Sequence, residues 1–337
     1  MAWVLNVERS AKTPPPNSSS DIFTKEAIRE AWDRGYDEVA KRVFAEPFDT
    51  EKYFRTKDVK HESGKVASLR EWSGIIPVNR DADDIPALTH GEGFTWDWIV
   101  QDYRALIAVE RKMLEDDEHG AADGRQAGLL RAFGRTVNFR LADVLNRAGF
   151  GVAGASVPVI ADDGCTLIDD DRPNPNPEGG TWSNLEAASD FDEDAIYAAH
   201  LNAERQVSEN GWLYPQEIKK IVLPVEQRQN AWKTLTKEGV MVRQYEDNSW
   251  AASMFDFSKD VEFAKYLTTS AVFYLLADAK SDENELYMVR RQNPTVKTEW
   301  GSMPNPDVMY SRLRARFGVA LGSPRKYIRG GLLSSGS

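Results

Sequence analysis

The chain has 337 residues, enough for one large domain or two modest ones around a substantial buried core. Its hydrophobic fraction of 41% and charged fraction of 28% are ordinary for a soluble globular protein. No run approaches the roughly 20 apolar residues that cross a bilayer, and Met1–Arg9 lacks the pattern of a secretory signal. The net charge of −11 argues against a dedicated nucleic-acid clamp, which needs a basic face to displace counterions.

Cysteine and tryptophan give two further limits. The single cysteine, Cys165, excludes an intramolecular disulfide and a multi-cysteine metal site, and fits a protein kept in reducing cytoplasm. The ten tryptophans are unusual, and fit either an extensive contact surface or one large aromatic core.

The N-terminal region combines a leader with a helix. Thr13–Ser20 is too rich in Pro and Ser to belong to a compact core. Ser20 or Asp21 can cap a following helix, whose apolar stripe is formed by Ile22, Ile28, Trp32, Val39 and Val43. Such a helix either acts as an arm that docks on another body or packs on its own domain.

An extended hairpin is predicted next. Lys65–Val78 is typical of a strand, and the polar, acidic stretch Asn79–Asp84 follows it. In the second strand Phe94, Trp96, Trp98 and Val100 alternate with Thr95, Asp97 and Ile99. Because a hairpin of this kind is marginal by itself, we expect it to need a surface to lie on.

The middle of the chain mixes helices and strands. The clearest helix has an apolar row every four residues and ends at Gly149; the row is Leu129, Phe133, Val137, Leu141 and Leu145. Asp162-Asp163-Gly164 predicts a tight turn between two short strands, 157–160 and 165–168. Beyond a Pro/Asn/Gly-rich loop, 169–182, we expect helices at 192–207 and through 231–235, and strands at 219–223, 240–245, 271–277 and 286–290.

The C-terminal region has the best alternation in the sequence. Leu313, Ala315, Phe317, Val319 and Leu321 face one way, whereas Arg312, Arg314 and Arg316 face the other. A last strand is expected at 325–329, and the whole chain is therefore of the α+β class.

No pattern builds a catalytic, cofactor or metal site. Gly149-Phe-Gly-Val-Ala-Gly154 satisfies GxGxxG, but a helix precedes it and a strand follows, the reverse of the dinucleotide-binding order. The carboxylates of 162–171 do not have EF-hand spacing and are expected to form a turn and a solvated acidic loop. The four histidines are scattered, and Cys165 is expected to be a small buried residue.

The order of parts resembles the HK97-fold major capsid proteins of tailed bacteriophages. Phrases similar to those of the Mu-like branch are Val109–Asp117 before the long helix, Asp163–Leu167, Ile221–Pro224, Arg291–Pro294 and Arg312–Gly318. The likeness extends over most of the chain from about residue 60 and rests on the ordered set of features. Where Mu-like subunits often carry an Asn-containing His motif, this chain has Arg172–Asn176.

The resemblance implies an N-terminal arm (1–60), an extended E-loop (61–110), a spine helix with the first part of a peripheral domain (111–184), an inserted axial domain (185–285), and the rest of the peripheral domain with a tail (286–337). It implies a structural protein and no enzyme, which forms hexamers and pentamers of an icosahedral shell around double-stranded DNA and is assembled in the host cytoplasm. Scaffold, portal and decoration proteins are implied partners. The alternatives are an encapsulin-like nanocompartment shell and a soluble metal-dependent enzyme using the acidic loop.

Under this resemblance, the contacts between subunits are expected at two groups of residues. Trp72, Trp96 and Trp98 of the hairpin are expected to be buried only against a neighbour. The three arginines of the C-terminal strand repel one another unless carboxylates face them. Asp81, Asp83 and Asp84 of a neighbouring hairpin could supply those carboxylates; pairing within the subunit or exposure to solvent is the alternative.

Overall fold

The computed structural model describes residues 6–8, 25–44, 48, 50–51, 54–69, 92–115, 121–147, 164–173, 180–185, 191–207, 213, 215–235, 254–268, 272–277, 286–302, 307–322, 324 and 327–331. The chain divides into two compact units. Unit 1 comprises 1–62, 99–140 and 288–318, and unit 2 comprises 63–98, 141–287 and 319–337. Within the described ranges, no helix is both long and apolar enough to cross a membrane.

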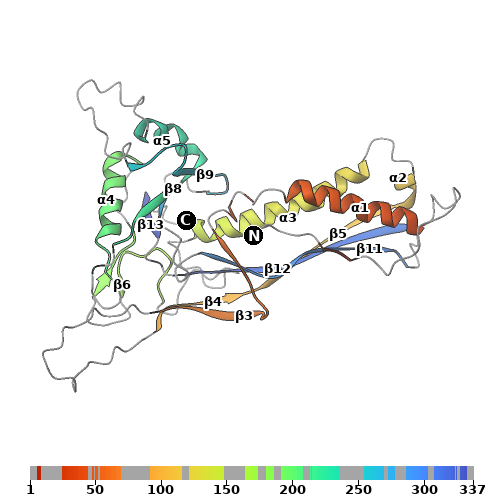
Figure 1. Cartoon of the computed structure of the whole chain (residues 1–337), viewed down its shortest axis with the longest axis horizontal. Coiled ribbons are helices and arrows are strands. Elements are labelled where there is room, and N and C mark those ends of the chain that lie inside the picture. Colours follow the sequence, from red (N-terminus) through yellow and green to blue (C-terminus); the bar gives the residue numbers. More distant parts are fainter. Residues whose placement is uncertain are drawn as a thin grey trace, which may run out of the picture. The chain divides into compact units, whose positions relative to one another are not determined.

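A long sheet forms the base of unit 1 (Figure 1). Its strands follow the order β1 (Asn6–Glu8), β11 (Tyr287–Trp300), β12 (Val308–Ala320) and β5 (Gln101–Glu110), and β2 (Arg55–Asp58) also pairs with β11. The predicted alternation of β12 is confirmed, because Leu313, Ala315 and Phe317 are buried. Strand β5 has no counterpart among the predicted elements, which placed only the end of the preceding strand in this region.

Two helices cover one face of this sheet: α1 (Lys25–Val43) and α3 (Ala121–Asn146), the latter preceded by the short α2 (Arg111–Glu115) (Figure 1). Trp32 Nε1 of α1 donates a hydrogen bond to Ser311 Oγ of β12 at 2.9 Å, and the ring of Phe133 of α3 packs edge-on against Phe317. The predicted apolar row of α3 is buried throughout. Of the two expectations for the first helix, the structure favours packing on its own unit.

A second sheet and two helices form the core of unit 2. The strand order is β13 (Tyr327–Gly331), β10 (Val272–Ala277), β8 (Ile218–Pro224) and β9 (Val261–Ala264). Helix α4 (Glu193–Glu204) begins where Asp192 Oδ1 accepts a hydrogen bond from the Ala195 N–H, and α5 (Arg228–Leu235) follows a 3-10 turn at Val225–Gln227. The small side chains of α4 pack among those of the strands, which confirms the predicted helix at 192–207 and strands at 219–223 and 271–277.

Two small sheets also belong largely to unit 2. One pairs β3 (Ser63–Leu69) with β4 (Glu92–Ile99), which confirms the predicted second strand and the first part of the strand predicted at 65–78, whose residues 70–78 lie outside the described ranges. The other pairs β6 (Arg172–Pro173) with β7 (Thr181–Trp182). The remaining hairpin candidates, Trp72, Asp81, Asp83 and Asp84, lie outside the described residues, as do Gly149 and the strands expected at 157–160 and 240–245.

The expectation that Trp96 and Trp98 need a neighbouring subunit to bury them is wrong. Trp96 is 0% exposed and Trp98 is also buried within the chain itself. The indole of Trp98 lies so close to Gly64 of β3 that a Cβ there would come within 2.6 Å of its ring. Most of the described tryptophans are buried, which favours the aromatic-core interpretation of the composition.

Candidate functional site: the arginine face of the long sheet

The face of the β12–β5 pair opposite to α1 and α3 carries most of the arginines of unit 1's sheet. In the antiparallel register Arg314 lies opposite Arg104, Arg316 opposite Asp102, and Arg312 opposite Leu106. Because side chains alternate along a strand, all six point away from the face that α1 and α3 cover. We call Asp102, Arg104, Leu106, Arg312, Arg314 and Arg316, together with Tyr310 from the same side of β12, the arginine face.

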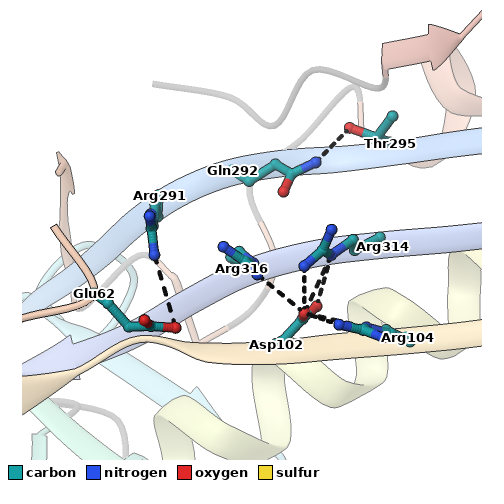
Figure 2. Close-up of polar contacts among 8 residues, drawn as sticks. All are labelled: Glu62, Asp102, Arg104, Arg291, Gln292, Thr295, Arg314 and Arg316. Atoms are coloured by element: carbon teal, nitrogen blue, oxygen red, sulfur yellow. Dashed lines mark hydrogen bonds and ion pairs between the residues drawn. The ribbon is translucent and has the colours of Figure 1, made fainter. Parts of the chain in front are cut away.

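Asp102 is the centre of this face (Figure 2). Its Oδ2 accepts hydrogen bonds from Nη2 of Arg104 and Nη2 of Arg314, both at 2.6 Å, and from Nη2 of Arg316 at 3.4 Å. The Nε groups of Arg104 and Arg314 also donate to this carboxylate at 3.1 Å. The hydrogen bonds from Arg314 and then from Arg104 hold the pKa of Asp102 far below its ordinary value of 3.8.

The carboxylate of Asp102 therefore accepts hydrogen bonds from three guanidiniums, and a fourth arginine, Arg312, lies on the same face. Arg312 makes no hydrogen bond with any residue that the structure describes, although its charge helps to lower the pKa of Glu299, and Nε of Arg316 likewise has no acceptor among the described residues. Arg104 keeps 62% of its side chain exposed. The arrangement is a preorganised cluster of charged donors with an excess of positive charge, suited to binding carboxylates or phosphates.

Aromatic packing on the opposite face of the same strands holds the arginine face in place. Tyr103 stacks on Phe317 with ring centroids 4.3 Å apart, and Phe133 of α3 closes the cluster edge-on at 6.2 Å. Gly318 allows the backbone of Ile99 to approach closely, because any Cβ at this position would collide with the Ile99 carbonyl oxygen. The charged cluster thus lies on a rigid, close-packed sheet.

Further ion pairs connect the end of β2 and the residues that follow it to β11. Arg290, 4% exposed, donates through Nε to Asp58 Oδ1 at 2.8 Å, and Arg291 lies 3.7 Å from Glu62 (Figure 2). On the same strand Gln292 Nε2 donates to Thr295 Oγ1 at 3.3 Å. The Arg290 hydrogen bond lowers the pKa of Asp58, so this carboxylate stays ionised across the neutral range.

A separate cluster in unit 2 was not predicted from the sequence. The buried Arg172 lies between two indoles, 5.7 Å from the ring centre of Trp96 and 5.9 Å from that of Trp182, and donates to the Thr166 carbonyl. Nearby, buried Asn184 donates to the carbonyls of Leu167 and Pro324, each at 2.9 Å. The contact of Arg172 with Trp96 holds strand β4 against the described residues of 164–185.

Of the predicted site residues, Arg314 and Arg316 therefore lie together on Asp102, while Arg312 is next to them on the same face. Cys165 is only partly buried, less than expected. Within the described ranges, no three His, Cys, Asp or Glu side chains are grouped so that they could hold a metal ion.

Comparison with known proteins bears on the fold. No protein-family model and no curated protein matches the chain. Among solved structures, it is similar to the capsid of an empty GTA particle (TM-score 0.51, 11% identity, 86% of this chain and 91% of that one) and to the capsid of cyanophage Pam1 (0.51, 12%, 86% and 93%). A phage-related protein from Bordetella bronchiseptica gives a TM-score of 0.50 at 12% identity over 87% and 96%.

These similarities extend over nearly the full length of both chains in each comparison. They agree with the α+β order of elements described above. They confirm the predicted resemblance at the level of fold. The chain has the HK97-like fold of tailed-phage capsid proteins.

Proposed function

We propose that the chain is the major capsid protein of a tailed bacteriophage, a structural subunit and no enzyme. The observation that carries the proposal is the match of 86% of the chain to subunits of phage and GTA shells. On this proposal many copies form hexamers and pentamers, and these tile an icosahedral shell around double-stranded DNA. Scaffold, portal and decoration proteins are its partners by analogy, and assembly takes place in the host cytoplasm.

The proposed role of each region follows the boundaries expected from the sequence. Residues 1–60 serve as the N-terminal arm, whose helix α1 packs on the sheet of its own unit. Residues 61–110 serve as the E-loop, 111–184 as the spine helix and first part of the peripheral domain, 185–285 as the axial domain, and 286–337 as the rest of the peripheral domain with the tail. Support for a special role of 185–285 comes from its own buried core, which joins α4, α5 and strands β8 to β10. The contact candidates between subunits are Trp72, Asp81, Asp83 and Asp84, together with Arg312, Arg314 and Arg316.

Light scattering on the purified protein after size-exclusion chromatography tests the proposal. We expect capsomers or megadalton particles, since many moderate contacts are summed by symmetry. A discrete monomer at all concentrations would contradict it. Extraction of nuclease-treated particles from their native source then separates a phage shell, which releases double-stranded DNA, from an encapsulin-like compartment, which releases cargo protein.

A further inference from the structure

Charge is divided unequally between the two units. Counted from the sequence, unit 1 has 24 Lys and Arg against 21 Asp and Glu, a difference of +3. Unit 2 has 18 against 32, a difference of −14, so the whole net charge of −11 comes from unit 2. The opposite signs of the two units favour attraction between the basic unit of one copy and the acidic unit of another.

The arginine face concentrates the positive charge of unit 1. Each guanidinium has five N–H donors, and the Nη1 groups of Arg104 and Arg314 have no acceptor among the described residues. Asp102 fixes the planes of these guanidiniums without neutralising them, so less side-chain entropy is lost when a further carboxylate binds. Arg312 adds a further positive charge, which interacts electrostatically with Glu299 but makes no hydrogen bond with a described carboxylate.

The residue types of the arginine face are those of a protein interface. Arg and Tyr are enriched at interfaces and dominate their binding energy, whereas Lys is depleted. Here Tyr310 and four arginines share one side of two strands with Leu106, whose side chain is 58% exposed although it lies opposite Arg312. An exposed leucine among arginines gains from a partner that excludes water.

We propose that the arginine face of one copy binds carboxylates of unit 2 of a second copy. The contact is heterologous, since different surfaces meet, and such contacts form a ring when the rotation from copy to copy closes. Carboxylates suit the bidentate geometry of guanidinium, and the acidic chain as a whole repels nucleic acid. This inference rests on the proposed function and adds to it the two surfaces that meet and the electrostatic nature of their contact.

A double variant, Arg104→Gln with Arg312→Gln, tests the proposal by removing two charges that are not needed to hold Asp102 and Arg314 together. Its matched control is Arg131→Gln with Arg135→Gln, two exposed arginines of α3 in the same unit with no partner among the described residues. We expect the double variant to need at least about tenfold more protein to assemble at low salt, and the control to behave as the unaltered chain. Raising the salt concentration should reduce the difference in the protein concentration that the double variant and the unaltered chain need for assembly, because salt screens exposed charges.

Thermal unfolding of both variants shows whether each remains folded, and Arg312→Lys supplies a second, direct readout. The introduced amine can be coupled to a carboxylate by a carbodiimide in particles assembled from mixed light and heavy-isotope subunits. We expect mixed-isotope crosslinks from position 312 to Asp or Glu of residues 63–98 or 141–287.

Crosslinks only within one chain, or unaltered assembly of the double variant, would overturn the inference and leave the proposed function intact. Binding of a duplex oligonucleotide that the double variant alone loses would instead assign the arginine face to DNA, and would also overturn it. Failure of the unaltered chain to form any particle would contradict the proposed function, and the inference with it.

Discussion

At the level of single residues, Asp102 determines how the guanidiniums of the arginine face are arranged. It is the only described carboxylate that the three guanidiniums of Arg104, Arg314 and Arg316 hydrogen-bond. Without it these like charges on neighbouring strand positions would repel one another. The carboxylate therefore stabilises unit 1 and at the same time orients donors for an outside partner.

Replacing Asp102 with Asn should destabilise the protein by about 1 kcal/mol near neutral pH, because the pair is partly exposed. The folded-state pKa of Asp102 is lowered, so its contribution is present above the unfolded value of 3.8 and is lost as the pH falls from there towards the folded pKa. Urea unfolding of both proteins at several pH values measures this. The free-energy difference between them should shrink below pH 3.8; a difference that is constant with pH would exclude the assigned role.

Arg172 gives a second prediction at this scale. Arg172→Met keeps an unbranched side chain but removes the guanidinium, and with it the hydrogen bond to Thr166 and the cation–π contacts with Trp96 and Trp182. We expect a loss of about 2 kcal/mol of unfolding free energy, accompanied by a change in tryptophan fluorescence. The exposed Arg205, changed to Met in the same way, serves as the control and should alter neither quantity.

Among the elements, those with a clean period could be predicted and those without it could not. Helix α3 and strand β12 have unbroken apolar rows, since one face of each is fully buried. Strand β5 ends the described strand order of its sheet, and most of its residues are exposed or half-buried, so no two-residue period marks it. The arginine row was predictable from β12 alone, whereas its partner Asp102, 212 residues from Arg314, depends on the pairing of two distant strands.

The close approach at Gly318 provides a test of how the long sheet is packed. Gly318→Ala places a Cβ against the backbone of Ile99, which cannot rotate away as a side chain could, and should cost about 1–3 kcal/mol. Gly128→Ala on α3 is the matched control: no atom lies within 4 Å of its Cβ, so the better helix propensity of Ala should stabilise by about 0.5–1 kcal/mol. Chemical denaturation of the two variants should therefore give opposite signs, and equal effects would contradict this packing.

For the whole molecule, the division of charge between the two units and the capsid-like fold both favour the association of many copies. A basic sheet face and an acidic unit in one chain allow copies to attract one another although each has a net charge of −11. In a shell of the proposed kind, the same net charge would oppose close contact between the subunits and packaged DNA. Assembly should therefore be sensitive to salt, in a way that a shell held together by apolar contacts alone would not be.

Electron microscopy of the purified, unaltered protein shows whether its copies assemble into a shell. We predict closed shells whose hexamers and pentamers are built from subunits of this fold, with β12 and β5 of one subunit facing unit 2 of its neighbour. A preparation that contains only monomers or small discrete oligomers across the protein and salt concentrations tried would contradict the account.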